Sequence, residues 1–369
     1  MRRTRGLSRR ALTALLALTL ATRTLRPVAA SDEPLDALAA EIARWSVFLR
    51  DHPGNDEIWT DVKAGSQPLI ARAEEALRDG RRLLALLRLA SPRPGLSAAA
   101  YLAERSPEQR KDPAAFEAEW TRMGSLLRDD LGTPSAAALA GVRPAAVRAL
   151  GEAALPQVRV YYEASLEYGR NTMPDAGLFY IGAAQAQREF TALCRRLSMP
   201  STREAPPVRA LDVELDALEA DLLAAYRPPA SIDRHPEFIV ASSTLKEARE
   251  LNGLGLRYGA LLRYLQARLR IAPLGPSPAP IDAAALGSLL RELDQRLSAS
   301  GIDDSLGRLF LEAAQAEVAS AKPGEVAAAA AAIARDVLPR YFAALEPSRP
   351  AAPRPAPRAT VTLVRWPYT

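Results

Sequence analysis

The stretch LDALAAEIARWSVFL, residues 35–49, is the clearest sign of how this chain folds. Its large apolar residues follow one another at intervals of three, four, three and four positions: Leu35, Leu38, Ile42, Trp45 and Leu49. Residues at this spacing lie along one side of an α-helix, because the helix has about 3.6 residues per turn. The stretch therefore predicts an amphipathic helix that buries one face.

The same helical spacing recurs from Pro34 to Glu346, without the alternation that is typical of a half-buried strand. Clusters of proline and glycine, such as 91–95 and 273–280, divide this range into about ten helices. We therefore expect an all-α fold, either a multi-helix bundle or an irregular helical array. The proline-containing stretch 200–207 separates an N-terminal helical half (31–199) from a C-terminal half (200–346), which are either two domains or one.

Three segments carry more specific expectations. Turn-forming residues at 52–64 predict an interruption after the first helix, and Asp112 followed by Pro113 predicts a helix start. Pro156 lacks a backbone N–H, so it should kink or split the helix that begins near Pro144.

Three glycines interrupt the helical pattern predicted for 236–271: Gly253, Gly255 and Gly259. Each costs about 1 kcal/mol relative to alanine inside a helix. We expect a close helix crossing at Gly255 and Gly259 to be the reason. A helix break, or a ligand that approaches the backbone, is the alternative.

The first 30 residues have the pattern of a cleavable signal peptide. A basic segment precedes an 11-residue apolar run, 11–21, and Val28-Ala29-Ala30 provides small residues before a cleavage site at Ser31. The apolar run is shorter than the roughly 20 residues of a membrane-spanning helix. We therefore expect a bacterial protein that is periplasmic or secreted and has no transmembrane span in its mature chain.

The export route has two readings. Ser8-Arg9-Arg10 resembles the twin-arginine export motif, and the general secretory route is the alternative. The resemblance implies a protein that folds before export, often around a cofactor. The sequence leaves the identity of such a cofactor unknown.

Net charge argues against a nucleic-acid-binding protein. The chain has 48 basic and 43 acidic residues, but residues 1–30 hold seven arginines and no acid, so the remainder carries 41 against 43, or −2. A nucleic-acid-binding face needs an excess of basic residues to neutralise phosphates. We therefore expect no nucleic acid among the partners.

No catalytic or metal-binding set is recognisable in the sequence. Cys194 is the single cysteine, which excludes an intramolecular disulfide, and its apolar helical position predicts burial. The two histidines, His52 and His235, both precede proline, and we expect them in helix-capping loops rather than as metal ligands. No hydrolase nucleophile motif and no nucleotide-binding glycine pattern occurs. We therefore predict no catalytic residue and no metal ligand.

One cluster remains as a candidate pocket. The segment YYEASLEYGRNTMP, 161–174, gathers aromatic and polar residues at a helix end. Such residues suit a ligand pocket or a partner surface, since tyrosine is amphipathic. Packing in the core and helix capping are the alternative explanation. The candidate residues are Tyr161, Tyr162, Tyr168, Arg170 and Asn171.

The end of the chain has a different composition. Residues 347–359 form a proline-rich linker, and 360–369 form a β-branched and aromatic run that predicts one short C-terminal strand. A single strand needs a pairing partner, either the helical body itself or the sheet edge of another protein. The candidate partner-binding residues are Val361, Leu363, Val364, Trp366 and Tyr368.

Two functions are compatible with these features. The first is a non-enzymatic binding or scaffold component of the cell envelope, whose partner is another envelope protein. The second is a small-ligand or cofactor-binding protein, with or without enzymatic activity, that folds before twin-arginine export.

Overall fold

The structure is a computed structural model, which describes residues 33–52, 57–171, 173–199, 203–228, 231–275, 281–321 and 326–345. Within these residues the fold is helical throughout, and an isolated bridge between Glu204 and Ile302 is the sole β-type pairing. The prediction of an all-α fold is therefore confirmed. The predicted signal segment (1–30), linker (347–359) and terminal strand (360–369) lie outside the described residues.

The α-helices of the N-terminal half are α2 (Glu33–Asp51), α3 (Glu57–Arg78), α4 (Arg82–Ala90), α5 (Arg93–Ala103), α6 (Pro107–Lys111), α7 (Pro113–Leu126), α8 (Ala145–Arg170) and α9 (Pro174–Arg196). Those of the C-terminal half are α10 (Asp212–Ala225), α11 (His235–Gly253), α12 (Arg257–Ile271), α13 (Ala283–Ala299), α14 (Ser305–Ser320), α15 (Ala328–Ala332) and α16 (Leu338–Leu345). Short 3₁₀ turns occur at Ala136–Leu139, Ile232–Arg234 and Ala272–Leu274, and a π-helical segment, Ile333–Val337, joins α15 to α16.

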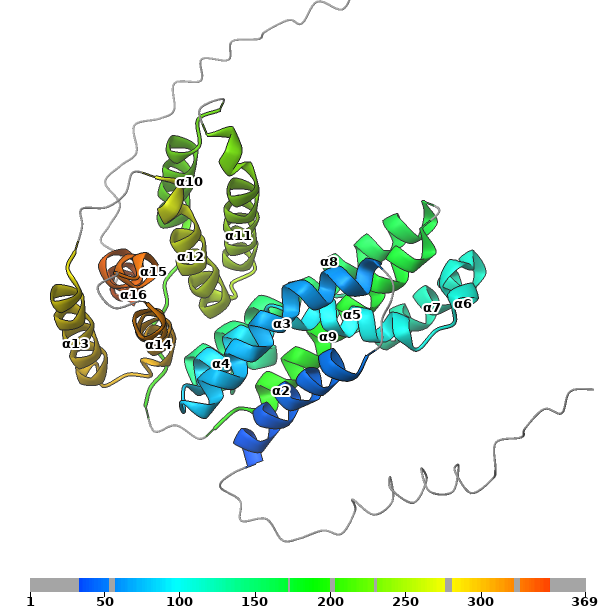
Figure 1. The fold of residues 1–369 in the computed structure, drawn as a ribbon, viewed down its shortest axis with the longest axis horizontal. Coiled ribbons are helices and arrows are strands. Elements are labelled where there is room, and N and C mark those ends of the chain that lie inside the picture. Colours follow the sequence, from blue (N-terminus) through cyan, green and yellow to red (C-terminus); the bar gives the residue numbers. More distant parts are fainter. Residues whose placement is uncertain are drawn as a thin grey trace, which may run out of the picture.

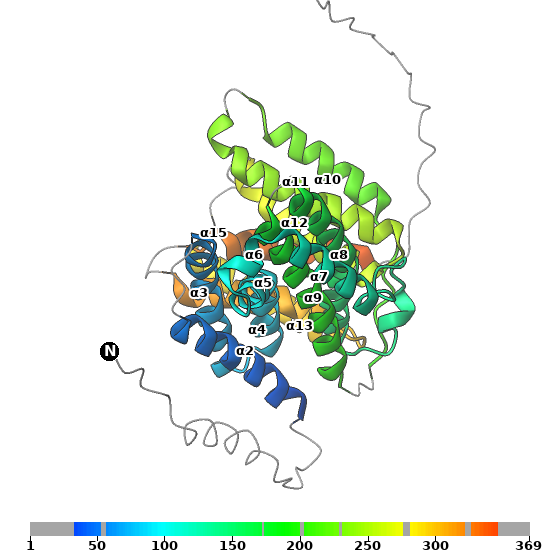
Figure 2. The ribbon, with the colours of Figure 1, turned by 90° about the vertical axis from the view of Figure 1, so that its right-hand side faces the viewer.

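The helices form two arms that meet at an angle (Figure 1). In the longer arm, α8 and α9 form a central pair, with α5 and α7 packed on α9 and α3 packed on α4 and α5. Helices α10, α11 and α12 form the second arm, which meets α8 mainly through α12. Helix α14 contacts both α4 and α8, and α13, α15 and α16 gather around it (Figure 1). Figure 2 shows α10 and α11 above the helices of the longer arm.

One hydrophobic core runs through both arms. It includes Leu38, Ile42 and Trp45 of α2, which are at most 3% exposed, and continues to Tyr341 of α16. A smaller cluster around Phe116 and Met123 fills the outer end of the longer arm, between α5, α7, α8 and α9. The two halves of the sequence therefore share a core across the stretch 200–207.

The central helix α8 receives its N-terminal cap from a distant part of the chain. Its own N-cap residue, Pro144, offers no side-chain acceptor. Instead, the backbone N–H of Ala145 donates to Asp303 Oδ2 at 2.6 Å, and that of Ala146 donates to Ser305 Oγ at 2.9 Å. Free N–H groups at a buried helix end are unfavourable, so these acceptors stabilise the contact between the two halves.

One expectation about helix boundaries is wrong, and one is narrowed. Residues 57–64, expected in a turn, belong to α3, because Trp59 is buried and its ring packs edge-on against Phe48 at 5.1 Å. Tertiary packing outweighs the local turn signals there. Of the two outcomes expected at Pro156, a kink or a split, the split does not occur, since α8 continues through this residue from Ala145 to Arg170 while packed along α9.

The expected long helix 236–271 is two helices, α11 and α12. Gly255 lies in the turn between them with φ of 73°, in the left-handed region that glycine adopts readily. For Gly255, the alternative of a helix break is therefore confirmed, and the expectation of a close helix crossing is wrong. At Gly259 the close crossing is confirmed, because a Cβ atom there would lie 2.9 Å from Glu152 Cβ of α8.

Candidate functional site

The five candidate pocket residues at the end of α8 point to different neighbours. Tyr162 is buried and faces α7: its ring stacks on Trp120 at 5.1 Å and its hydroxyl donates to the Trp120 carbonyl oxygen at 3.0 Å. Arg170 also faces α7, where its Nε lies 2.8 Å from Glu117 Oε1. These two side chains hold α7 against α8.

The other three candidates do not join them in one pocket. Tyr168 is exposed and stacks on Tyr180 of α9 at 4.8 Å, and Asn171 directly follows the last residue of α8. Tyr161 lies on a further side of the helix and lines a cleft between the two arms. Of the five candidates, Tyr161 lines this cleft, together with residues that the sequence did not single out.

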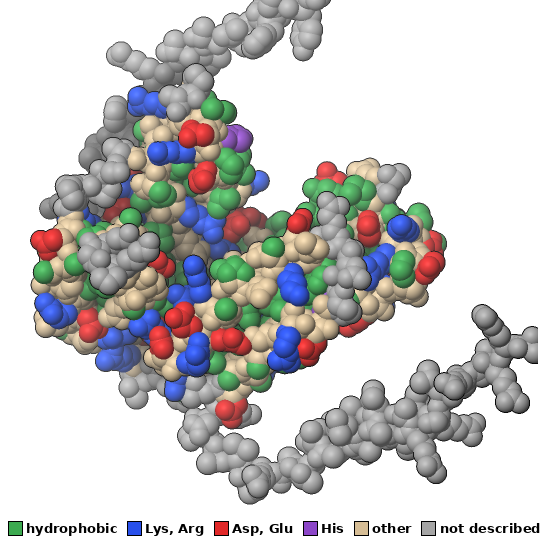
Figure 3. Space-filling model, viewed as in Figure 1, with side chains coloured by type: hydrophobic (Ala, Val, Ile, Leu, Met, Phe, Trp, Pro, Cys, Tyr) green, Lys and Arg blue, Asp and Glu red, His purple; other side chains and the backbone are tan. Residues whose placement is uncertain are grey.

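We call this cavity the interhelical cleft; its volume is about 330 Å³. It lies where α12 and α11 approach α8, with α3, α4, α5 and α9 completing its wall. Figure 3 shows a hollow between the two arms, with charged side chains of both signs on its floor. The lining residues are Leu69, Leu87, Arg88, Ala90, Ser91, Pro94, Leu150, Ala153, Ala154, Gln157, Tyr161, Gln187, Phe190, Glu247, Leu262, Arg263, Gln266 and Arg270.

Apolar side chains form the deep part of the cleft. Leu150, Ala153 and Ala154 of α8 and Leu262 of α12 are buried and belong to the continuous core. Phe190 of α9 is also buried and adds an aromatic surface. A ligand in contact with these residues would remove apolar surface from water.

Tyr161 and Gln187 form a polar pair on the wall between α8 and α9. Burial raises the pKa of Tyr161, and the nearby charge of Glu247 acts in the same direction. The polar side chain of Gln187 lowers the pKa of Tyr161 only slightly. The hydroxyl is therefore a neutral hydrogen-bonding group at ordinary pH.

Three arginines and one carboxylate supply the charge of the cleft. Arg263 Nε lies 2.9 Å from Glu247 Oε2, which joins α12 to α11. Arg88 donates to the Arg72 carbonyl oxygen at 2.8 Å, and Arg270 donates to Thr244 Oγ1 at 2.9 Å. Neither of these two forms an ion pair with a carboxylate in the described part of the chain.

Partial burial acts on both of these arginines. It lowers the pKa of Arg88, and it lowers the pKa of Arg270, where the neighbouring positive charge of Arg263 adds to the effect. Guanidinium groups remain charged at physiological pH even so. The cleft therefore presents positive charge that its own carboxylate does not balance.

A buried ion pair holds α12 in place beside the cleft. Glu152 of α8 is fully buried: it accepts from Arg148 Nε at 2.8 Å and from the backbone N–H of Gly259 at 2.9 Å. The Arg148 guanidinium lies 4.4 Å from the ring centre of Tyr258, whose hydroxyl donates to the Pro206 carbonyl oxygen. Glu152 thus caps the N-terminus of α12, where the local sequence supplies no side-chain cap.

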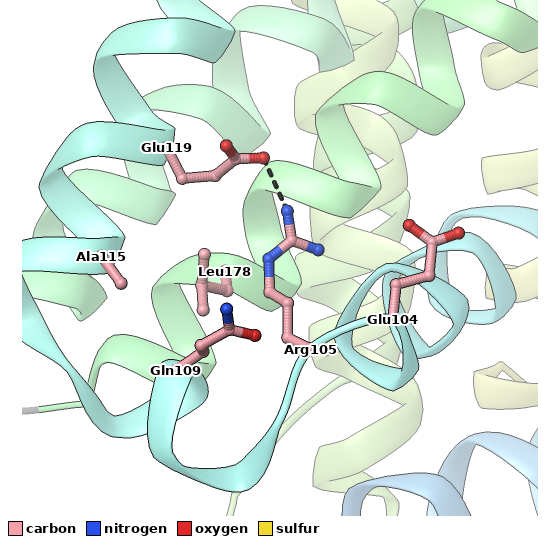
Figure 4. A pocket seen from close by; sticks show the side chains of 6 residues that line it. All are labelled: Glu104, Arg105, Gln109, Ala115, Glu119 and Leu178. Atoms are coloured by element: carbon pink, nitrogen blue, oxygen red, sulfur yellow. Dashed lines mark hydrogen bonds and ion pairs between the residues drawn. The ribbon is translucent and has the colours of Figure 1, made fainter.

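A second hollow, of about 350 Å³, is shown in Figure 4. It lies between α5, α6, α7 and α9 and is lined by Glu104, Arg105, Gln109, Ala115, Glu119 and Leu178. Here Arg105 Nη2 lies 2.6 Å from Glu119 Oε1, and Arg122 and the Tyr101 hydroxyl donate to the same carboxylate. The charge of Arg105 is therefore balanced within the hollow, which makes it a weaker ligand site than the interhelical cleft.

Other reactive groups give no further centre in the described residues. No group of three or more His, Cys, Asp or Glu side chains able to hold a metal ion occurs among them. Cys194 is buried as predicted, and burial raises the pKa of its thiol to about 12. Among the helices that the structure describes, none combines the length and the apolar character needed to cross a membrane.

The histidines lie at helix ends. His52 directly follows α2 and stacks on Phe48 at 5.0 Å. His235 is the first residue of α11, and its Nδ1 lies 2.8 Å from the Tyr226 hydroxyl. These contacts account for both side chains.

No protein-family model, curated protein or solved structure shows a significant match to this chain. The candidate site therefore rests on the geometry of the chain itself. Sequence reasoning missed the charged residues of the cleft, although one signal was present. Arg263, Gln266 and Arg270 are spaced by three and four positions, which places them on one side of α12 as a polar stripe in an otherwise buried helix.

Proposed function

We propose that this chain is an exported binding protein that holds a small ligand in the interhelical cleft. The observation that carries the proposal is the cleft itself: a cavity of about 330 Å³ at the junction of the two arms, with an apolar interior and hydrogen-bonding groups around it. Ligand sites in proteins have volumes upwards of about 300 Å³ and this mixture of lining residues, and they occur preferentially at such junctions. Of the two functions that the sequence leaves open, the cleft favours the small-ligand protein over the scaffold component.

Binding in this cleft would have two contributions. Contact with Leu150, Leu262 and Phe190 would stabilise an apolar part of the ligand by about 25 cal/mol for each Å² removed from water. Gln157, Gln266 and the arginines would orient its polar part by hydrogen bonds. Because α12 is fixed on α8 through Glu152, we expect a largely preformed site.

A blocking substitution tests the site. Gln157 lines the cleft and is half-buried, so the change Gln157→Trp fills the cavity from α8 without altering the deeper core. Val160 lies on the same helix, is 40% exposed and does not line the cleft, so Val160→Trp is the matched control.

The measurement is native mass spectrometry of the mature protein isolated from the envelope fraction of its host. We expect an additional mass of small-molecule size in the wild type and in Val160→Trp, and its loss in Gln157→Trp. A partner of protein size that disappears when residues 347–369 are deleted would contradict the proposal and favour the scaffold function, with Val361, Leu363, Val364, Trp366 and Tyr368 in the binding segment.

Export is a separate part of the proposal and has its own test. The basic segment, the short apolar run and the small residues before Ser31 support a periplasmic or secreted location. Replacement of Arg9 and Arg10 by lysines should stop export if the twin-arginine route is used. Unchanged export would favour the general secretory route and remove the support for a cofactor acquired before export.

A further inference from the structure

We infer that the ligand of the interhelical cleft is a compact organic anion, whose acidic group binds Arg88 or Arg270 and whose apolar part contacts the interior of the cleft. This inference rests on the proposed function and names the chemical class of its ligand. It is drawn from the charge of the cleft, from the acceptors that its arginines now use, and from the contrast with the second hollow.

The charge balance is the first step. Arg88, Arg263, Arg270 and Glu247 are the charged residues that line the cleft, which gives three positive charges and one negative charge. The single carboxylate is engaged by Arg263 at 2.9 Å. Two guanidinium groups, Arg88 on α4 and Arg270 on α12, thus form no ion pair, although the charges of Glu75 and Glu317 act on Arg88 and that of Glu247 acts on Arg270.

The acceptors of these two arginines are the second step. Arg88 donates to a backbone carbonyl and Arg270 to the Thr244 hydroxyl, and both acceptors are neutral. A guanidinium group carries five N–H donors, and each of these arginines retains donors for a ligand. Carboxylate, sulfonate and phosphate groups are the acceptors that match its planar geometry best.

Arginines near the other cavities provide a contrast. In the hollow of Figure 4, Arg105 pairs with the carboxylate of Glu119. Arg122, which does not line this hollow, pairs with the same carboxylate. Farther along α9, Arg188 pairs with Asp130 at 3.0 Å. Arg105, Arg122 and Arg188 are therefore paired with acids, whereas Arg88 and Arg270 are not. Arg195, beside Arg188, resembles the latter two because it donates to the Ala138 carbonyl oxygen at 3.4 Å.

The apolar interior of the cleft favours a ligand with an apolar part over a simple inorganic ion. Contact with a small hydrated ion would not remove the apolar surface of Leu150, Leu262 and Phe190 from water. Contact with an aliphatic or aromatic group would remove it and so stabilise binding. The volume of about 330 Å³ is at the lower end of the range for ligand sites. The fitting ligand is thus compact and carries its acidic group at one end.

A pair of fluorescent dyes tests this directly with the full chain. 1-Anilinonaphthalene-8-sulfonate is an organic anion, and N-phenyl-1-naphthylamine is the same aromatic body without the sulfonate. Both increase in fluorescence in an apolar site, so each can be titrated against the protein. The fluorescence increase assigned to the cleft is the part that is absent in Gln157→Trp and present in Val160→Trp.

We expect the anionic dye to bind the cleft at least about tenfold more tightly than the neutral dye. The variants Arg88→Gln and Arg270→Gln remove one guanidinium each, and loss of the arginine that the acidic group contacts should weaken the anionic dye about tenfold, as expected for one hydrogen bond between charged groups. Neither should change the affinity of the neutral dye. Arg188→Gln is the matched control and should change neither affinity. The thermal unfolding midpoint of each variant shows whether it is folded.

The outcomes separate the two proposals. If both dyes occupy the cleft with equal affinity, or if neither arginine variant weakens the anionic dye, the inference of an anionic ligand is overturned while the proposed binding function stands. If Gln157→Trp removes no signal of either dye, the cleft is not a binding site and both proposals fail.

Discussion

The crossing of α12 over α8 at Gly259 makes a prediction that can be worked out from interatomic distances. We consider the single change Gly259→Ala. The added Cβ atom would lie 2.9 Å from Glu152 Cβ, 3.0 Å from the Ala153 backbone nitrogen and 3.1 Å from the Glu152 carbonyl carbon. Carbon atoms in contact normally lie about 3.5–4.0 Å apart, and two of these neighbours are backbone atoms that cannot rotate away. The two helices must therefore separate by several tenths of an ångström.

The cost follows from three contributions. Overpacking of this kind destabilises a protein by about 1–3 kcal/mol. Separation of the helices also stretches the hydrogen bond from the Gly259 N–H to the Glu152 carboxylate, now 2.9 Å long, and bonds to charged groups contribute about 1.5–3 kcal/mol. The gain in helix propensity from glycine to alanine offsets about 1 kcal/mol. We expect a net loss of about 2 kcal/mol, which for a cooperative unit of about 300 residues corresponds to a fall in melting temperature of roughly 3 °C.

Two neighbouring glycines provide controls in the same segment. No heavy atom lies within 4 Å of a Cβ placed on Gly253 or on Gly255. Gly253→Ala, at the end of α11, should leave the melting temperature unchanged or raise it slightly. Gly255→Ala should destabilise by about 1–2 kcal/mol through its φ of 73° alone.

The assay is thermal unfolding followed by circular dichroism at 222 nm, with all four proteins under one buffer condition. The decisive comparison is Gly259→Ala with Gly253→Ala. Equal melting temperatures for these two variants would refute the close crossing of α12 and α8, and with it the position of the interhelical cleft.

Three further predictions concern other parts of the fold. Asp303→Ala leaves a buried N–H at the start of α8 without an acceptor and should cost about 1–3 kcal/mol in denaturant unfolding, more than Asp112→Ala at the exposed start of α7; equal losses would argue against the distant cap. Burial tends to raise the pKa of Glu41, but the charge and hydrogen bonds of Arg93 outweigh it, so its folded pKa lies below the usual 4.5. The ionised Glu41 carboxylate therefore stabilises the folded state at pH values above 4.5. The difference in urea midpoint between wild type and Glu41→Gln should have its full size at pH 7 and decrease as the pH falls through the folded pKa of Glu41. A midpoint difference that does not change with pH would contradict a lowered pKa. Cys194, whose thiol has its pKa raised to about 12 by burial, should react with an aromatic disulfide reagent only after denaturant is added, and rapid labelling of the native protein would show that the site is open.

Local periodicity explains why much of the fold is readable from the sequence. Leu38, Ile42, Trp45 and Leu49 are all buried on one side of α2, as their spacing predicts, because helix formation and burial of one face depend on neighbouring residues. The signals failed where distant contacts decide the structure. Trp59 packs against Phe48 and extends α3 into the predicted turn.

The candidate site is less predictable for the same reason. The sequence singled out Tyr161, which does line a cleft, but it grouped this residue with neighbours that face other helices. The polar stripe on α12 was readable in principle from the spacing of Arg263 and Arg270. Glu247 and Arg88 lie near this stripe because of the way α11 and α4 pack against α12 and α8. No local sequence pattern predicts that packing.

The distant cap of α8 also sets the order in which the chain can reach its final form. Asp303 follows its partner Ala145 by 158 positions. A ribosome adds roughly 5–20 residues per second, so the first turn of the central helix waits roughly 8–30 s for its acceptors after it has been made. A fragment that ends before Asp303 lacks both acceptors, so the first turn of α8 has no cap until the C-terminal part of the chain is present.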